Sequence, residues 1–310
     1  MLLLKIFYFI KPLIPRKLQI FLRRKRAIKK ISLFSHIWPI DKEAIAPISH
    51  SICWPENKKF ALVLTHDVET NKGQNNCLPL MKLEKKYGFR SAFYFVPERY
   101  KQDKNLHLHL KNQGFEIGIH GLKHDGRLFQ NKNIFLNRAK KINKYMKEWE
   151  ALGFRSPAMH HNLEWIHALN IEYDSSTFDT DIFEPQSDGV RTIFPFHVNS
   201  KPKKKGYIEL PYTLPHDFTL FIILRKKNID IWIEKLDWIA KHGGMVLLIT
   251  HPDYMDFTNT NSHYEEYPAK YYQYFLEYIT KNYKGHYWHA LPNQVAKYVY
   301  QIVNLNKARI

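Results

Sequence analysis

Short apolar runs alternate with longer segments of helical spacing over most of this chain. The apolar runs cover residues 60–66, 91–96, 115–120, 152–155, 171–175, 207–210 and 245–250. Apolar positions recur at helical spacing over 77–87, 103–113, 133–150, 162–169, 229–242, 267–282 and 293–304. Strands that alternate with helices of this length predict parallel β–α–β units and hence an α/β fold. Seven such units suit a barrel at least as well as an open sheet.

A single barrel domain fits the length of the chain and the motifs that are missing from it. The 310 residues suffice for one large α/β domain, which we place at residues 55–305. No glycine-rich phosphate loop follows the first strand, which argues against a nucleotide-binding open sheet. The two cysteines, Cys53 and Cys77, match neither a disulfide framework nor a common zinc motif.

The first 40 residues differ from the rest in charge and hydropathy. The chain has 47 Lys and Arg against 29 Asp and Glu, yet residues 1–40 contain no acidic residue. The opening stretch, MLLLKIFYFIKPLIP, is apolar over about 14 residues, whereas a spanning helix needs ~20. We therefore predict that residues 1–40 form a basic amphipathic segment that associates with a membrane surface through residues 1–35. A basic helix packed on its own domain is the alternative.

This uneven charge also bears on partners and location. A basic end favours an anchor over a nucleic-acid partner, so we expect no nucleic acid. The positive charge follows the apolar part, and no cleavage site of a signal peptide is visible. We therefore expect a cytoplasmic protein, peripheral at the inner face of the cytoplasmic membrane. An exported and membrane-anchored protein is the alternative.

Polar residues gather at the carboxyl ends of four predicted strands, in the segments THDVET (65–70), HGLKHD (120–125), FRSP (154–157) and THPDY (250–254). These ends meet at one rim of a parallel barrel, where barrel enzymes build their sites. His120 and His124 are four residues apart, so a helical turn would bring both imidazoles to one side. Two imidazoles and one carboxylate, from Asp67 or Glu69, are a recurring catalytic metal set.

Five segments, THDVE, HGLKH, FRSP, YDSS and LLITHPDY, in this order, resemble the polysaccharide deacetylases of carbohydrate esterase family four (the NodB-homology domain). The resemblance covers roughly residues 55–300. It implies an irregular (β/α)7 barrel and metal-dependent hydrolysis of an N-acetyl group.

The resemblance also implies a role for individual residues. His120 and His124 fall on the family's metal ligands, and Asp67 on its catalytic base. Arg155 falls on the arginine that orients this base, for which we expect a bidentate pair with Asp67. The remaining positions are the general acid His251, the acetyl-pocket residue Leu248, and Asp174 and Ser175 as substrate contacts.

Two motifs depart from the usual family pattern. Most members have a second Asp where this chain has Val68, but one branch spaces the two acids by one residue. By that pattern Glu69 is the third metal ligand, and an exchange of roles between Asp67 and Glu69 stays open. The Asp-Trp pair that supports the general acid in many members is also missing. Support for His251 is then expected from Asp174, Asp179 or Asp181.

The expected function is a metal-dependent hydrolase that removes N-acetyl groups from the amino sugars of a cell-surface or lipid-linked polysaccharide. The expected cofactor is Zn²⁺, with Co²⁺ or another divalent ion as an alternative. The same metal and base would serve an amidohydrolase that cleaves a formamide or a cyclic amide, as in allantoinase-like relatives. A non-catalytic glycan-binding barrel is the third possibility.

Overall fold

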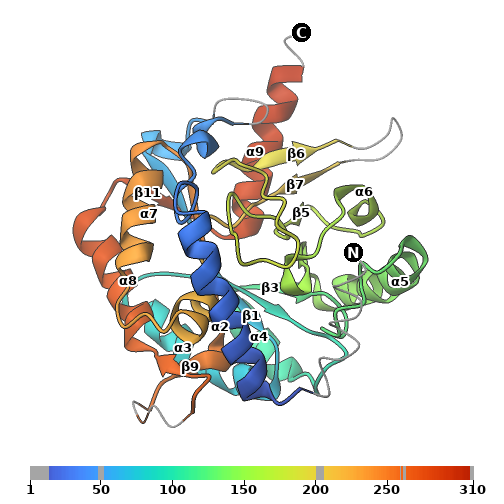
Figure 1. The fold of residues 1–310 in the computed structure, drawn as a ribbon. Helices are drawn as coiled ribbons and strands as arrows, with labels where there is room; N and C mark the ends of the chain where they lie inside the picture. Colours follow the sequence, from blue (N-terminus) through green and yellow to red (C-terminus); the bar gives the residue numbers. More distant parts are fainter. Residues whose placement is uncertain (1–13, 48–51, 200–205, 259, 261–262, 308–310) are drawn as a thin grey trace.

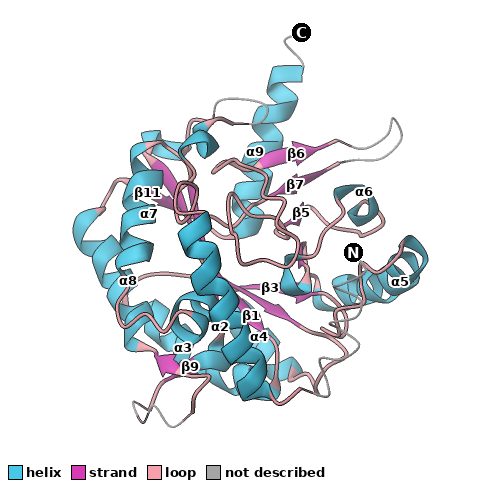
Figure 2. Ribbon diagram, in the orientation of Figure 1, coloured by secondary structure: helices cyan, strands magenta, loops and turns pink. Residues whose placement is uncertain are grey.

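A curled, largely parallel sheet surrounded by helices forms the body of the protein (Figures 1 and 2). The computed structural model describes residues 14–47, 52–199, 206–258, 260 and 263–307. The barrel strands in this part are β1 (Phe60–Val68), β2 (Ala92–Phe95), β3 (Glu116–His120), β4 (Gly153–Arg155), β5 (Tyr173–Asp174), β7 (Tyr207–Glu209) and β8 (Met245–Thr250). These match the seven predicted strands, and the (β/α)7 barrel-type fold is confirmed.

Parallel pairing runs around the barrel and closes it beyond β7. The order β1-β2-β3-β4-β5-β7 is continuous, and β8 pairs with β1. A parallel bridge between Leu214 and Leu248 joins the segment after β7 to β8. Every residue of β1 and β8 is buried, as expected for parallel strands covered on both faces.

Helices follow most of the barrel strands and cover the outside of the sheet. They are α3 (Asn71–Lys86), α4 (Lys104–Asn112), α5 (Lys132–Trp149), α6 (Leu163–Ile166), α7 (Asp230–Lys241), α8 (Lys270–Asn282) and α9 (Pro292–Lys307). Side-chain caps fix where several of them begin. Asp103 accepts hydrogen bonds from two amides of the first turn of α4, and Asn131 accepts one from Ile134 in α5.

Several elements lie outside the predicted set. β11 (Tyr287–His289) pairs in parallel with β1, and β6 (Phe196–Val198) pairs antiparallel with β7. Both are three residues long, and β11 is only half-buried, so neither has a long apolar run. β9 (Met255–Asp256) and β10 (Tyr267–Pro268) form a separate two-stranded sheet.

The basic N-terminal segment contains the helix α2 (Arg16–Leu33), which packs on the barrel domain. Ile20 and Ala27 are buried against the domain, each 3% exposed. Arg24 donates hydrogen bonds to the carbonyls of Ile222 and Ile223. The structure thus has the packed helix that the sequence left as an alternative, while residues 1–13 lie outside the described residues. No helix in the described ranges has the length and apolar character needed to cross a bilayer.

Candidate active site

Six of the predicted site residues come together at the carboxyl rim of the barrel. Asp67 lies near the end of β1 and Glu69 follows that strand, while His120 and Arg155 are the last residues of β3 and β4. His251 directly follows β8. Strands of one sheet therefore deliver these side chains to one rim, although Asp67 and His251 are 184 residues apart along the chain.

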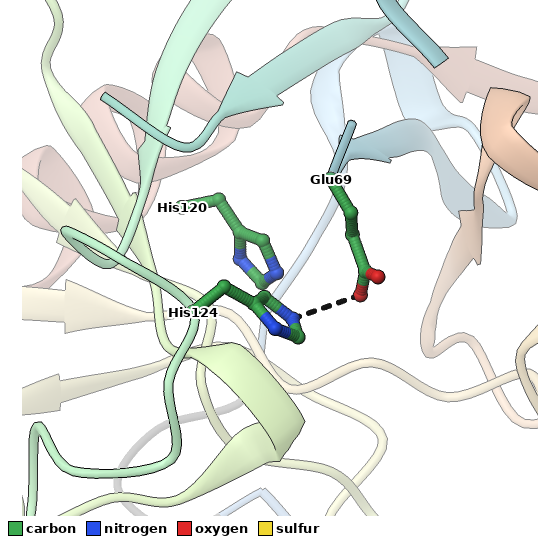
Figure 3. A group of neighbouring side chains, drawn as sticks. All are labelled: Glu69, His120 and His124. Atoms are coloured by element: carbon green, nitrogen blue, oxygen red, sulfur yellow. Dashed lines mark ion pairs between the residues drawn. The ribbon is translucent and has the colours of Figure 1, made fainter. Parts of the chain in front are cut away.

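Glu69, His120 and His124 point toward one another and form a candidate metal centre (Figure 3). Their ligand atoms all lie within 4.8 Å of one another. The Glu69 Oε1 and His124 Nε2 atoms are 2.8 Å apart. The two atoms form an ion pair, and His124 Nε2 is buried with no hydrogen-bond partner of regular geometry among the described residues. Such an orphaned nitrogen beside a carboxylate fits a shared metal ion, since two imidazoles and one carboxylate are a common zinc set.

The loop after β3, not a helical turn, brings the two histidines together. His120 ends the strand, and His124 lies in the following loop with a φ of +54°. Left-handed backbone is costly for a non-glycine residue and is often found at functional sites. His120 Nδ1 donates to the Arg155 carbonyl at 3.2 Å, which leaves its Nε2 free to bind an ion. Burial lowers the pKa of His120 to about 4, so its imidazole is neutral, as a ligand must be.

Asp67 is buried and held by the Arg155 guanidinium. Arg155 Nη1 donates to Asp67 Oδ1 at 3.0 Å and to Thr65 Oγ1 at 2.9 Å. This is one hydrogen bond and not the expected bidentate pair, because Nε and Nη2 of Arg155 donate to Ser175 instead. Burial raises the pKa of Asp67, but His120, which is protonated in the acid range where Asp67 titrates, and the permanently charged Arg155 outweigh burial, so the net shift is downward. Asp67 is therefore ionised at neutral pH.

His251 is held in the opposite protonation state by Asp217. His251 Nδ1 donates to Asp217 Oδ1 at 2.6 Å, and the His251 amide donates to Oδ2 at 2.7 Å. Burial lowers the pKa of His251, but the Asp217 charge and hydrogen bond outweigh it and raise the pKa to about 10. His251 Nε2 lies 3.9 Å from Glu69 Oε1, so a protonated imidazole faces the candidate metal centre.

The expected partners of His251 were wrong, because Asp217 takes this role. Asp179 instead pairs with Lys235, at 2.8 Å and 3.0 Å. Asp181 accepts from Tyr212, and Asp174 accepts from Ser176. Asp217 follows β7 by eight residues and lies beyond the bridge at Leu214, so inspection of the strand ends alone missed it.

A second residue that the sequence reasoning passed over, Asp253, positions Glu69. Its Oδ2 accepts the Glu69 amide at 3.0 Å, and its Oδ1 accepts the Thr70 hydroxyl at 2.5 Å. Asp253 lies within the THPDY segment, whose other polar residues were the signal available in the sequence. Tyr254 Oη, from the same segment, lies 3.4 Å from Glu69 Oε2.

The three expected substrate-binding residues are buried behind the rim. Ser175 is fully buried; it accepts from Arg155 and donates to the Leu210 carbonyl, so it positions the arginine. Asp174 is fully buried beside Glu209, and burial raises its pKa well above the usual range. Leu248 is 1% exposed in β8. Contact between these side chains and a substrate stays a prediction.

Comparison with known proteins finds similarity in structure only. No family model matches the sequence, and no curated protein matches it. PuuE allantoinase superposes with a TM-score of 0.61 at 16% identity, over 85% of this chain and 98% of the other. A Pseudomonas aeruginosa PAO1 protein assigned to the polysaccharide deacetylases gives 0.61 at 14% identity, over 85% and 98%. One from Mycobacterium smegmatis, assigned likewise, gives 0.59 at 16%, over 81% and 93%.

The chain has the polysaccharide deacetylase fold. This confirms the resemblance at the level of fold, and the same fold also occurs in an allantoinase. Sequence identities of 14–16% do not transfer an activity, because one fold hosts many chemistries. A function for this barrel therefore has to be argued from its own site.

Proposed function

We propose that this protein is a metal-dependent hydrolase that removes N-acetyl groups from amino sugars. The observation that carries the proposal is the pairing of an ionised Asp67 with a protonated His251 beside the Glu69, His120 and His124 cluster. Titratable groups whose pKa values are pushed apart within one site are typical of a general base and a general acid. Amide hydrolysis needs both.

Glu69, His120 and His124 would hold the divalent ion, Zn²⁺ or Co²⁺. When bound, such an ion polarises the amide carbonyl and lowers the pKa of water in its coordination sphere. We assign Glu69 as the metal ligand because it lies beside His124, and Asp67 as the base because it forms an ion pair with Arg155.

Asp67 and His251 then divide the proton transfers. Asp67 takes a proton from the water that attacks the carbonyl carbon, and Arg155 keeps the carboxylate oriented. His251 gives its proton to the amide nitrogen as the C–N bond breaks, so the sugar leaves as an amine. Asp217 holds His251 in its protonated form and fixes the ring. The products are acetate and the free amino sugar.

Acetate release from N-acetylated amino-sugar oligomers tests this proposal. We expect activity in the wild type with Zn²⁺ or Co²⁺ and its loss with a chelator. Asp67→Asn should lower the rate by about 10²–10⁴-fold, the range for removal of a general base. Asp230→Asn is the matched control, because Asp230 is exposed at the start of α7.

Two results would contradict the proposal. Activity that survives both the chelator and Asp67→Asn would rule out this mechanism. Purified protein without a stoichiometric divalent ion, and without activity after ion is added, would favour a non-catalytic glycan-binding barrel.

A second candidate is hydrolysis of another C–N bond, in a formamide or a cyclic amide. The observation in its favour is the similarity to PuuE allantoinase over 85% of this chain. The same variants on N-formyl sugars and on allantoin separate the two candidates. Turnover of allantoin with no acetate release would favour the second.

The biological substrate and location extend the proposal. We infer a cell-surface or lipid-linked polysaccharide as substrate, and a place at the inner face of the cytoplasmic membrane. The support is the cationic, acid-free sequence of residues 1–40. Recovery of the native protein in a periplasmic or external fraction would contradict this location.

A further inference from the structure

α2 has two different apolar faces, and only one of them is used within the protein. The inner face carries the buried Ile20 and Ala27 and the half-buried Arg24, which fasten the helix to the domain. The outer face carries large apolar side chains that are only partly covered in the described structure. They are Leu18, Phe21, Leu22, Ile28 and Leu33, which are 45%, 46%, 50%, 60% and 60% exposed.

The polar residues of the outer face are all uncharged or cationic. Lys17, Lys25, Arg26 and Lys29 are exposed among or beside the apolar residues, and the helix contains no Asp or Glu. Five exposed large apolar side chains on one helix are a costly arrangement in water and mark an interaction surface. These five apolar and four cationic residues of α2 are together called the outer face.

We propose that the outer face docks the protein on an anionic lipid bilayer. Charge complementarity selects this occupant, because a cationic surface without acids matches anionic headgroups. Lys25 and Lys29 interrupt the apolar residues, which would hinder seating in a dry protein groove. At a bilayer their long stems can lie along the acyl boundary while the ammonium groups reach the headgroups. The segment that docks is then α2 itself, in a fixed orientation on the domain.

The N-terminal end of the fastened helix lies beside the candidate active site. The Arg16 guanidinium lies 5.5 Å from the centre of the Phe218 ring, and Phe218 lies 4.9 Å from Tyr254 between ring centres. Tyr254 Oη in turn lies 3.4 Å from Glu69. Docking would thus hold the catalytic rim near the headgroups. If the proposed hydrolase activity is correct, on which this step rests, the substrate class is an amino sugar carried on a membrane lipid.

Co-sedimentation of the full-length protein with vesicles tests the docking surface without using activity. We expect binding to vesicles of phosphatidylcholine with 30% phosphatidylglycerol, and at least tenfold weaker binding to phosphatidylcholine alone. Because salt screens charges, NaCl at about 0.5 M should weaken the binding to the anionic vesicles. The double variant Leu18→Glu/Leu22→Glu should bind the anionic vesicles at least tenfold more weakly. Leu108→Glu/Leu152→Glu is the matched control, since these leucines are exposed elsewhere, at 58% and 38%.

Each outcome supports or overturns docking independently of catalysis. Unchanged vesicle binding by the Leu18→Glu/Leu22→Glu variant, or equal binding to neutral vesicles, would overturn the proposal. A shift of that variant from dimer to monomer in gel filtration, with no lipid effect, would identify a second copy of this chain as the occupant. Vesicle binding without acetate release would support docking and contradict the proposed hydrolase.

Turnover of a lipid-linked and of a water-soluble acetylated amino sugar then tests whether the substrate is carried on a membrane lipid. If docking delivers a membrane substrate, the Leu18→Glu/Leu22→Glu variant should lose turnover of the lipid-linked sugar and keep turnover of the soluble one. The retained soluble activity also shows that the variant is folded. Equal loss on both substrates would contradict the delivery role.

Discussion

At the scale of single residues, the candidate acid and base differ in the neighbour that fixes their charge. Arg155 holds Asp67 ionised, and Asp217 holds His251 protonated. Both pairs are buried, so little water screens them, and each neighbour matters more than it would at the surface. The sequence motifs indicated three of these four residues. Asp217 was missed because its contact with His251 depends on the path of the chain after β7.

Asp217→Asn should move the alkaline limit of activity to lower pH. With the pKa of His251 at about 10, the general acid is present below that pH and is lost as the pH rises through it. The Asp217 carboxylate is the largest influence that raises this pKa. Without it, the pH at which kcat/KM is lost on the alkaline side should decrease by about 1–3 units. The pH profile of kcat/KM measures this shift.

Tyr267→Phe is the matched control for that experiment. It removes the hydrogen bond that Tyr267 donates to Asp217 Oδ2 at 2.8 Å but leaves the charge in place. Its alkaline limb should stay close to that of the wild type. An unmoved limb in Asp217→Asn would show that Asp217 does not set the protonation of His251.

At the scale of elements, two glycines in β3 and β4 lie between two tyrosines in β2 and β5. The Tyr94 ring lies against Gly118 of β3, and the Tyr173 ring lies against Gly153 of β4. The two tyrosine hydroxyls are 2.8 Å apart, and Arg155 stacks on Tyr94 with its guanidinium carbon 4.4 Å from the ring centre. The glycines therefore make room for the rings that support the site arginine.

Gly153→Ala should destabilise the protein by about 1–3 kcal/mol, the range for overpacking a core. A Cβ atom at this position would lie 1.9 Å from Tyr173 Cζ, and the ring is buried and cannot swing away. Urea unfolding measures the free energy of unfolding. Gly285→Asn is the control and should change stability little. Its φ of +79° is one that asparagine tolerates, and a Cβ atom there would have no neighbour within 4 Å. A stability for Gly153→Ala equal to that of the control would contradict this account.

Element positions were predictable where the apolar signal is strong, and less so elsewhere. The long apolar runs that form the buried strands β1 and β8 made these strands of the barrel predictable. α3 begins at residue 71, six residues earlier than predicted, because its first turns, NKGQNN, contain no apolar residue. The start is visible only through Thr70, whose hydroxyl accepts from the Gly73 amide. The approach of His124 to His120 depends on a left-handed loop residue, which spacing alone does not reveal.

At the scale of the whole molecule, the basic N-terminal helix is part of the domain that carries the site. The sequence could not distinguish lipid contact from protein contact, because apolar residues occur on two sides of α2. Its inner face packs on the domain and its outer face is exposed. Lipid contact by residues 1–35 remains a proposal, but α2 is fastened to the barrel whether or not lipid is present.

Substitutions on the two faces of α2 should therefore differ in their effect on stability. Ile20→Asp places a carboxylate at a position that is 3% exposed, so it should lower the free energy of unfolding by about 2 kcal/mol or more. Leu22→Asp changes a side chain that is 50% exposed on the same helix, so its effect should stay within about 0.5 kcal/mol. Urea unfolding in the absence of lipid measures both. If the two variants were equally stable, α2 would be detached in solution, and docking of α2 could no longer fix the orientation of the active site at a membrane.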